Sequence, residues 1–126
     1  MKRTLLALIT LSLTISTTMA MNFDEAFKQS GSKPMALLLY ADWADNAQEV
    51  SQAFSAAEPM FANKYNFVKL NIANKDAKSF NKIYSIMPNL PYVMLFRDGT
   101  KFSRMVKSDC VMNSSCFSDK LNAFTN

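Results

Sequence analysis

Residues 37–47 constrain the fold more than any other part of the chain. An almost uninterrupted apolar run extends from Met35 to Tyr40, and residues 37–47 contain the end of this run and the segment that follows it. Such a run is typical of a strand that is buried on both faces of a sheet. From Asp45 the spacing of apolar residues becomes that of an amphipathic helix. The helical stripe comprises Val50, Ala53, Phe54, Ala57 and Phe61. The sequence therefore predicts a central strand that leads directly into a long helix, with Trp43, the only tryptophan, at the junction.

Two local signals refine this long helix. Asp45 followed three residues later by Gln48 is a capping-box pattern, which predicts that the helix begins there. Pro59 has no amide hydrogen and disfavours helical backbone at Glu58. We therefore expect a kink or a restart near the end of the helix.

Alternating helix and strand patterns fill the first half of the chain. Residues 22–31 predict a short helix, with Asn22 and Glu25 as a capping box and Gly31 as a left-handed end residue. Residues 66–72 alternate and predict a strand, and residues 76–86 return to helical spacing.

The second half predicts a hairpin and a final helix. Residues 92–96 are all apolar, and Asp98-Gly99 is a two-residue hairpin signal before a more polar strand over 101–107. We expect that strand at a sheet edge. After a cysteine-containing loop comes a short helix, capped by Ser114 or Ser115. Its apolar stripe comprises Phe117, Leu121 and Phe124. This order predicts an α/β fold whose mixed sheet is covered by helices on both faces.

The first 20 residues form a separate unit. Lys2 and Arg3 precede an apolar run, and Thr18-Met19-Ala20 ends it with small residues. This pattern predicts a secretory signal peptide over 1–20, which leaves 21–126 as a single domain that is exported to the periplasm or the extracellular space. An uncleaved anchor is the alternative, but the run is short and rich in Ser and Thr, which disfavours a membrane span.

Composition limits the chemistry. The chain has a formal charge of +4, and removal of Lys2 and Arg3 leaves 12 basic and 10 acidic residues without any Lys/Arg run, which disfavours a nucleic-acid partner. The absence of histidine, with only two cysteines, predicts no metal site and no cofactor. In an exported chain, Cys110 and Cys116 predict a disulfide.

Three segments resemble the thioredoxin family. Residues 40–43, Tyr-Ala-Asp-Trp, resemble its W-A-x-W entry, residues 68–72 its V-x-K-L-N-x-D strand, and residues 89–99 its G-I-P-T-x-x-x-F-x-x-G segment. The matches occur in the family's order and together span about residues 23–124. The resemblance implies a thioredoxin-like fold, a cis peptide bond before Pro91, and free backbone groups at Leu90 beside Trp43.

The resemblance fails where the family's chemistry lies. Its W-C-x-x-C motif reads Trp43-Ala44-Asp45-Asn46-Ala47 here, so both cysteines are alanine. The family's buried acid corresponds to Leu38, and its helix proline corresponds to Gln52. A thiol whose pKa is lowered by the helix N-terminus is therefore absent from this position.

These departures favour a binding module over an enzyme. The predicted groove contains Trp43, Asp45, Asn46, Leu90 and Pro91, and its ligand would be a peptide or a protein. Trp43 is either a ligand platform or a half-buried residue of the fold, and Asp45 and Asn46 are also good helix caps. The alternative is a thiol-disulfide oxidoreductase that uses a displaced Cys110/Cys116 pair. A third interpretation is an accessory subunit that docks through its helices.

Overall fold

The computed structural model describes residues 22–72, 90–99 and 101–125. The predicted signal peptide, the predicted helix over 76–86 and residues 87–89 of the predicted loop lie outside these residues.

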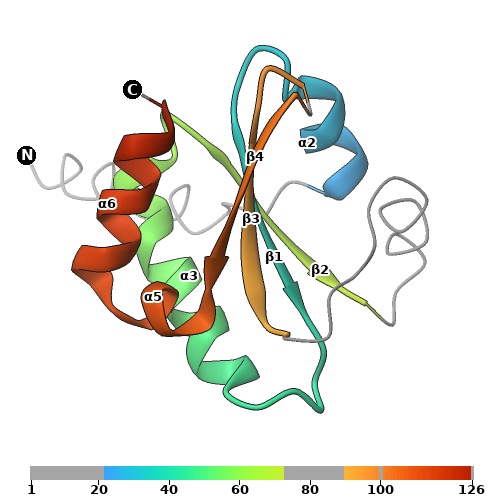
Figure 1. Cartoon of the computed structure of the whole chain (residues 1–126). Helices are drawn as coiled ribbons and strands as arrows, with labels where there is room; N and C mark the ends of the chain where they lie inside the picture. The colour runs from blue at the N-terminus through green and yellow to red at the C-terminus, as the bar shows by residue number, and fades with distance from the viewer. Residues whose placement is uncertain (1–21, 73–89, 100, 126) are drawn as a thin grey trace, which may run out of the picture.

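A mixed four-stranded sheet forms the centre of the described fold (Figure 1). The strands are β1 (Met35–Tyr40), β2 (Asn66–Asn71), β3 (Tyr92–Arg97) and β4 (Phe102–Lys107), in the order β2-β1-β3-β4. β1 runs parallel to β2 and antiparallel to β3, and β3 is antiparallel to β4. Five of the six residues of β1 are buried, as expected for a central strand.

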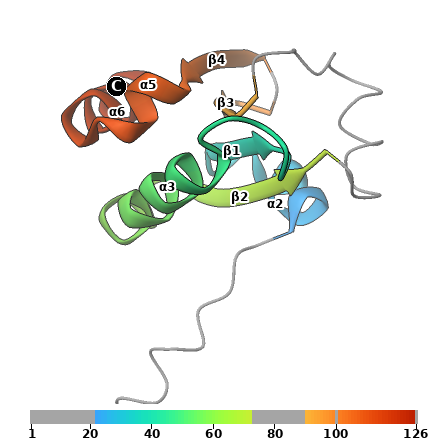
Figure 2. The ribbon, with the colours of Figure 1, turned by 90° about the horizontal axis from the view of Figure 1, so that it is seen from below.

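Helices cover both faces of this sheet (Figure 2). One face carries α3 (Ala47–Phe61), α5 (Ser108–Met112) and α6 (Ser114–Thr125), and the other carries α2 (Phe23–Gln29). Because successive strand residues point to opposite faces, Leu38 belongs to the first core cluster and Leu39 to the second. The predicted α/β class with a mixed sheet is therefore confirmed.

The two ends of α2 differ in how well the sequence predicted them. The Asn22 side chain accepts a hydrogen bond of 2.9 Å from the Glu25 amide, which confirms the predicted cap. The prediction for Gly31 is wrong, because the positive-φ glycine among the described residues is Gly99. Ser30 ends α2 in right-handed backbone, and its amide and hydroxyl both donate to the Phe27 carbonyl. That carbonyl is therefore satisfied without a left-handed residue.

α3 continues unbroken through Pro59 to Phe61, so the predicted restart is wrong. Pro59 lies in the last turn of the helix, where its missing amide hydrogen leaves only the Ser55 carbonyl without a donor. Both residues are exposed, so water can bind that carbonyl.

The β3–β4 hairpin is confirmed in place but not in length. Asp98 and Gly99 adopt positive φ angles of 53° and 73°, yet the last pair in register is Arg97 with Phe102, so the loop is longer than two residues. The Gly99 amide donates instead to the Ser30 carbonyl at 2.9 Å, which joins the hairpin to the end of α2. β4 is a largely exposed edge strand, as predicted.

Tyr65 provides a stability prediction. Its side chain is 1% exposed and its hydroxyl donates to the Leu121 carbonyl, which ties α6 to the start of β2. Burial raises the pKa of Tyr65 to about 12. Since the unfolded tyrosine ionises near pH 10, its contribution to stability is complete below pH 10 and is lost as the pH rises toward 12.

We expect this loss to amount to roughly 2–3 kcal/mol in the free energy of unfolding across that pH range. Tyr65→Phe removes the ionisable group and, at neutral pH, costs about 1 kcal/mol for the lost hydrogen bond. Urea denaturation of both proteins between pH 9 and 12 measures the effect. Equal alkaline slopes for wild type and variant would contradict the assignment.

Candidate functional site

The turn between β1 and α3 presents the residues that the sequence singled out. The Ala44 amide donates to the Ala41 carbonyl at 3.0 Å, and the Ala47 amide to the Ala44 carbonyl at 3.3 Å, so two turns follow each other. Asp42 and Trp43 are the central residues of the first turn, and Asp45 and Asn46 are those of the second. Side chains at such central positions point outward, and all four residues are exposed.

The start of α3 differs from the predicted capping box. Asn46, not Asp45, is the N-cap residue, and its side chain accepts no hydrogen bond from the helix. Asn46 has φ 61° and ψ 19°, a left-handed conformation that asparagine tolerates better than most residues. The amides of Gln48 and Glu49 have no acceptor among the described residues. They are open donors for a carbonyl oxygen or an anion.

Trp43 is 74% exposed and is therefore not a half-buried residue of the fold. The other large hydrophobic side chains with high exposure in the described part of the chain are Met60, Phe102 and Met112. An indole in water exposes a large apolar area with an N–H donor at its edge, which is the combination enriched at protein interfaces.

Leu90 and Pro91 lie at the same end of the sheet as this turn. The register pairs Tyr92 with Leu39, so the residues before β3 lie beside the end of β1, where the turn begins. The peptide bond between Leu90 and Pro91 is cis. Pro91 is buried and Leu90 is partly buried against the second core cluster. The topology thus places the predicted groove residues at one end of two neighbouring strands.

The turn between β1 and α3 contains no cysteine and therefore has no thiol that could exchange with a disulfide. Ala44 and Ala47 mark the beginning and end of the second turn, and Ala47 is the first residue of α3. Leu38, at the position of the family's buried acid, is fully buried in β1, the strand that precedes this turn. A leucine there can neither accept nor donate a proton.

Cys110 and Cys116 form a disulfide, as predicted. The segment between them is not a loop, because Cys110 lies in α5 and Cys116 in α6. The predicted cap is also wrong: Asn113, not Ser114 or Ser115, accepts the Cys116 amide at 3.1 Å. Both cysteines are partly buried.

The disulfide segment starts at the same end of the sheet as the turn between β1 and α3. β4 ends at Lys107, which pairs with Tyr92, and α5 follows at once. α5 then packs against α3 on the first core cluster. The turn after β1, the Leu90–Pro91 bond and the start of α5 therefore all lie at one end of the sheet.

Two hollows flank α3. A polar hollow of about 450 Å³ lies beside its first turns. It is lined by Tyr40, Asp42, Ala47, Gln48, Ser51 and Gln52. In the sequence, Gln48 is a predicted cap partner and Gln52 is the counterpart of the family's helix proline, but no binding role was predicted for either residue, and Ser51 was not singled out. Lys69 donates to the Ser51 hydroxyl at 2.8 Å on the same side of α3.

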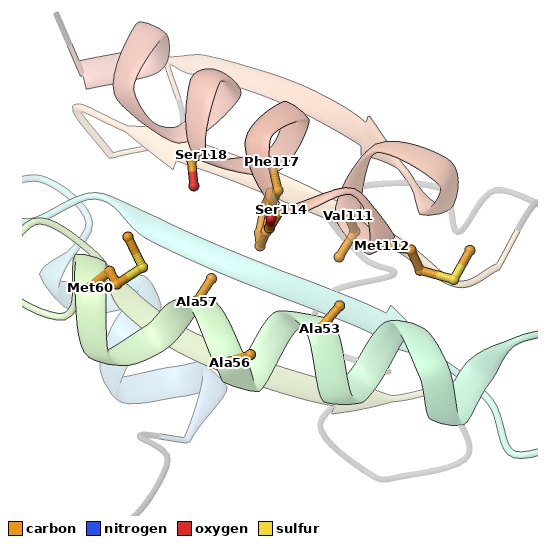
Figure 3. Close-up of a pocket in the computed structure, with 9 residues that line it drawn as sticks. All are labelled: Ala53, Ala56, Ala57, Met60, Val111, Met112, Ser114, Phe117 and Ser118. Atoms are coloured by element: carbon orange, nitrogen blue, oxygen red, sulfur yellow. The ribbon is translucent and has the colours of Figure 1, made fainter.

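An apolar pocket of about 100 Å³ lies between α3 and the α5–α6 pair (Figure 3). Ala53, Ala56 and Ala57 line it from α3, with Met60 and Met112 toward its two ends. Its volume is close to that of one aliphatic side chain. It is separate from the groove residues, none of which lines it.

Within residues 22–72, 90–99 and 101–125, no three His, Cys, Asp or Glu side chains are grouped so as to hold a metal ion. None of the helices in these same ranges is both long and apolar enough to cross a membrane.

Solved structures share this arrangement of strands and helices. The thioredoxin of Malassezia sympodialis aligns with a TM-score of 0.63 at 18% identity, over 81% of this chain and 84% of that chain. The protein has the thioredoxin fold. Deadhead, a germline-specific thioredoxin of Drosophila melanogaster, aligns with a TM-score of 0.60 at 13% identity, over 78% and 90% of the two chains. Fasciola hepatica thioredoxin gives 0.57 at 11% identity, over 79% and 88%.

No protein-family model and no curated protein matches the sequence. At these identities the structural likeness concerns the thioredoxin fold alone, and a fold hosts many functions. The function therefore has to be argued from the site.

Proposed function

We propose that the protein is an exported binding module with a thioredoxin fold, which holds an extended peptide or a segment of a protein partner without thiol exchange at α3. Residues 1–20 are its signal peptide and 21–126 its mature domain. The disulfide between Cys110 and Cys116 is compatible with export.

One contrast carries this proposal. The two positions that would supply thiols, Ala44 and Ala47, are alanine, whereas Trp43 beside them keeps an indole that is 74% exposed. Exposing an indole forfeits the hydrophobic stabilisation that its burial would give. A ligand that covers Trp43 recovers that stabilisation, and none of this requires a thiol.

Polar groups for a ligand backbone accompany the indole. The open amides of Gln48 and Glu49 can donate to a carbonyl oxygen, and the Asp45 and Asn46 side chains lie on the exposed turn. Leu90 and Pro91 form the other side of the proposed groove. An extended chain with unpaired carbonyl and amide groups matches such a surface.

A second candidate function is thiol–disulfide exchange by the Cys110–Cys116 pair. The observation in its favour is that both cysteines are partly exposed and that α5 starts at the groove end of the sheet. The reduction potential of this disulfide separates the two functions.

Trp43→Ala tests the proposed function. Selection from a random-peptide display library against the wild-type protein yields ligands whose affinities are then measured by fluorescence anisotropy. We expect the variant to bind the selected peptides at least about tenfold more weakly, because interface tryptophans typically cost 2 kcal/mol or more when truncated.

Met60→Ala is the matched control. Met60 is 70% exposed at the far end of α3 and lines the apolar pocket, so its truncation removes an exposed hydrophobic side chain without touching the groove. The proposal expects unchanged affinity for this variant. If binding is unchanged in Trp43→Ala but lost in Met60→Ala, the proposal is contradicted. The ligand would then bind to the helical face, as expected for an accessory subunit that docks through its helices.

A further inference from the structure

We infer that the groove at Trp43 selects a basic ligand segment, in which a lysine or arginine side chain covers the indole. This inference rests on the proposed function and specifies its ligand. It comes from the charges that surround the exposed ring.

Negative charge is in excess in the segment between β1 and α3 and at the start of α3. Asp42, Asp45 and Glu49 are exposed, and residues 41–50 contain no lysine or arginine. The chain as a whole has a formal charge of +4. Removal of Lys2 and Arg3 with the signal peptide still leaves 12 basic and 10 acidic residues, so the described residues next to Trp43 in the chain carry the opposite sign to the mature domain.

Helix stabilisation accounts for only part of this pattern. Glu49 lies in the first turn of α3, where a carboxylate interacts favourably with the helix dipole. Asp42 precedes the helix by five residues, and Asp45 does not cap it. Within the described residues neither aspartate has a hydrogen bond or an ion pair with the protein. Both carboxylates are therefore available to a ligand.

In the described part of the chain, two lysines border this surface. Lys69 is bound to the Ser51 hydroxyl, further along α3 than the acidic residues, and Lys107 ends β4 beside the start of β3. Asp109 follows Lys107 in the first turn of α5 and offsets its charge. Among residues 22–72, 90–99 and 101–125, the three carboxylates near Trp43 therefore outnumber the cations of the neighbouring elements.

A cationic side chain fits both features of the surface. The face of an indole attracts lysine and arginine, and carboxylates beside the ring form charge-assisted hydrogen bonds with the same cation. The ligand backbone can meanwhile offer a carbonyl oxygen to the open amides of Gln48 and Glu49. An acidic ligand would gain these amides but would lie against three like charges.

The random-peptide selection also tests this inference. We expect the peptides that lose affinity for Trp43→Ala to be enriched in lysine and arginine relative to the unselected library. For one selected basic peptide, replacing its lysines and arginines by glutamine is expected to weaken binding about tenfold, and raising the salt concentration is expected to weaken it too.

Two triple variants provide the matched comparison on the protein side. Asp42→Asn/Asp45→Asn/Glu49→Gln removes the three carboxylates near Trp43, whereas Asp24→Asn/Glu58→Gln/Asp119→Asn changes the net charge equally at other sites. We expect about a tenfold loss of affinity for the basic peptide in the first variant and less than a twofold change in the second.

The outcomes separate the inference from the function on which it rests. Failure to obtain any Trp43-dependent peptide overturns both. Trp43-dependent peptides that are neutral or acidic, or a basic peptide that binds both triple variants equally, overturn the basic specificity and leave the binding function intact.

Discussion

Cysteines introduced at Ala44 and Ala47 are expected to create a thiol–disulfide exchange activity at least about tenfold above that of the native protein. The reason is geometric and electrostatic. The Ala47 amide bonds to the Ala44 carbonyl, and the ends of such a turn lie within about 7 Å, close enough for a disulfide. Thiols at the start of a 15-residue helix have lowered pKa values, because the open amides there favour a thiolate.

Insulin reduction in the presence of dithiothreitol measures this gain. The Ala44→Ser/Ala47→Ser variant is the isosteric control, and it keeps the native Cys110–Cys116 pair. Because Leu38 cannot transfer a proton, we expect the new activity to stay below that of ordinary thioredoxins. A folded double-cysteine variant that forms the new disulfide but reduces no insulin would show that the site has lost more than its thiols.

The sequence predicted the elements whose signals are local and repeated. The apolar run of β1, the helical stripe of α3 and the polar character of β4 each extend over six or more residues, and each was confirmed. Such periodic patterns can be detected in the sequence because an element needs many apolar residues on one face to bury that face against the core.

Single-residue features were predicted less well. Asn46 and Asn113 are the N-cap residues where the sequence favoured Asp45 and Ser114 or Ser115. All of these residue types suit a cap, and the choice depends on the backbone angles that one residue adopts. The sequence predicts a loop between the cysteines because only Val111 is buried there, and a single buried residue gives no helical period to detect.

The residues of the candidate site were named from the sequence, but their environment was not. Whether Trp43 is half-buried or exposed depends on how the turn after β1 packs, and no local pattern encodes that packing. Likewise the register of β1 with β3 brings Leu90 and Pro91 beside the turn across about 50 residues of sequence. Such long-range proximity followed from the thioredoxin resemblance and not from composition or spacing.

The native disulfide is expected to resist reduction, in contrast to a catalytic pair. Each cysteine is followed by a buried core residue, Val111 after Cys110 in α5 and Phe117 after Cys116 in α6. Asn113 already occupies the Cys116 amide, so this group is less available to stabilise a thiolate. The packing of α5 and α6 holds the two sulfurs close together, which favours the disulfide over the two separate thiols. The bridge closes a short loop and contributes about 2 kcal/mol to stability.

The proposed function requires that this thioredoxin fold binds a ligand without exchanging disulfides. A redox titration of the mature protein, in which thiols at Cys110 and Cys116 are alkylated and counted by mass, tests it most directly. We expect a reduction potential below about −300 mV, in the range of structural disulfides. A bridge that exchanges near about −200 mV, the range of thiol-exchange enzymes, would contradict it and assign the function to the displaced cysteine pair.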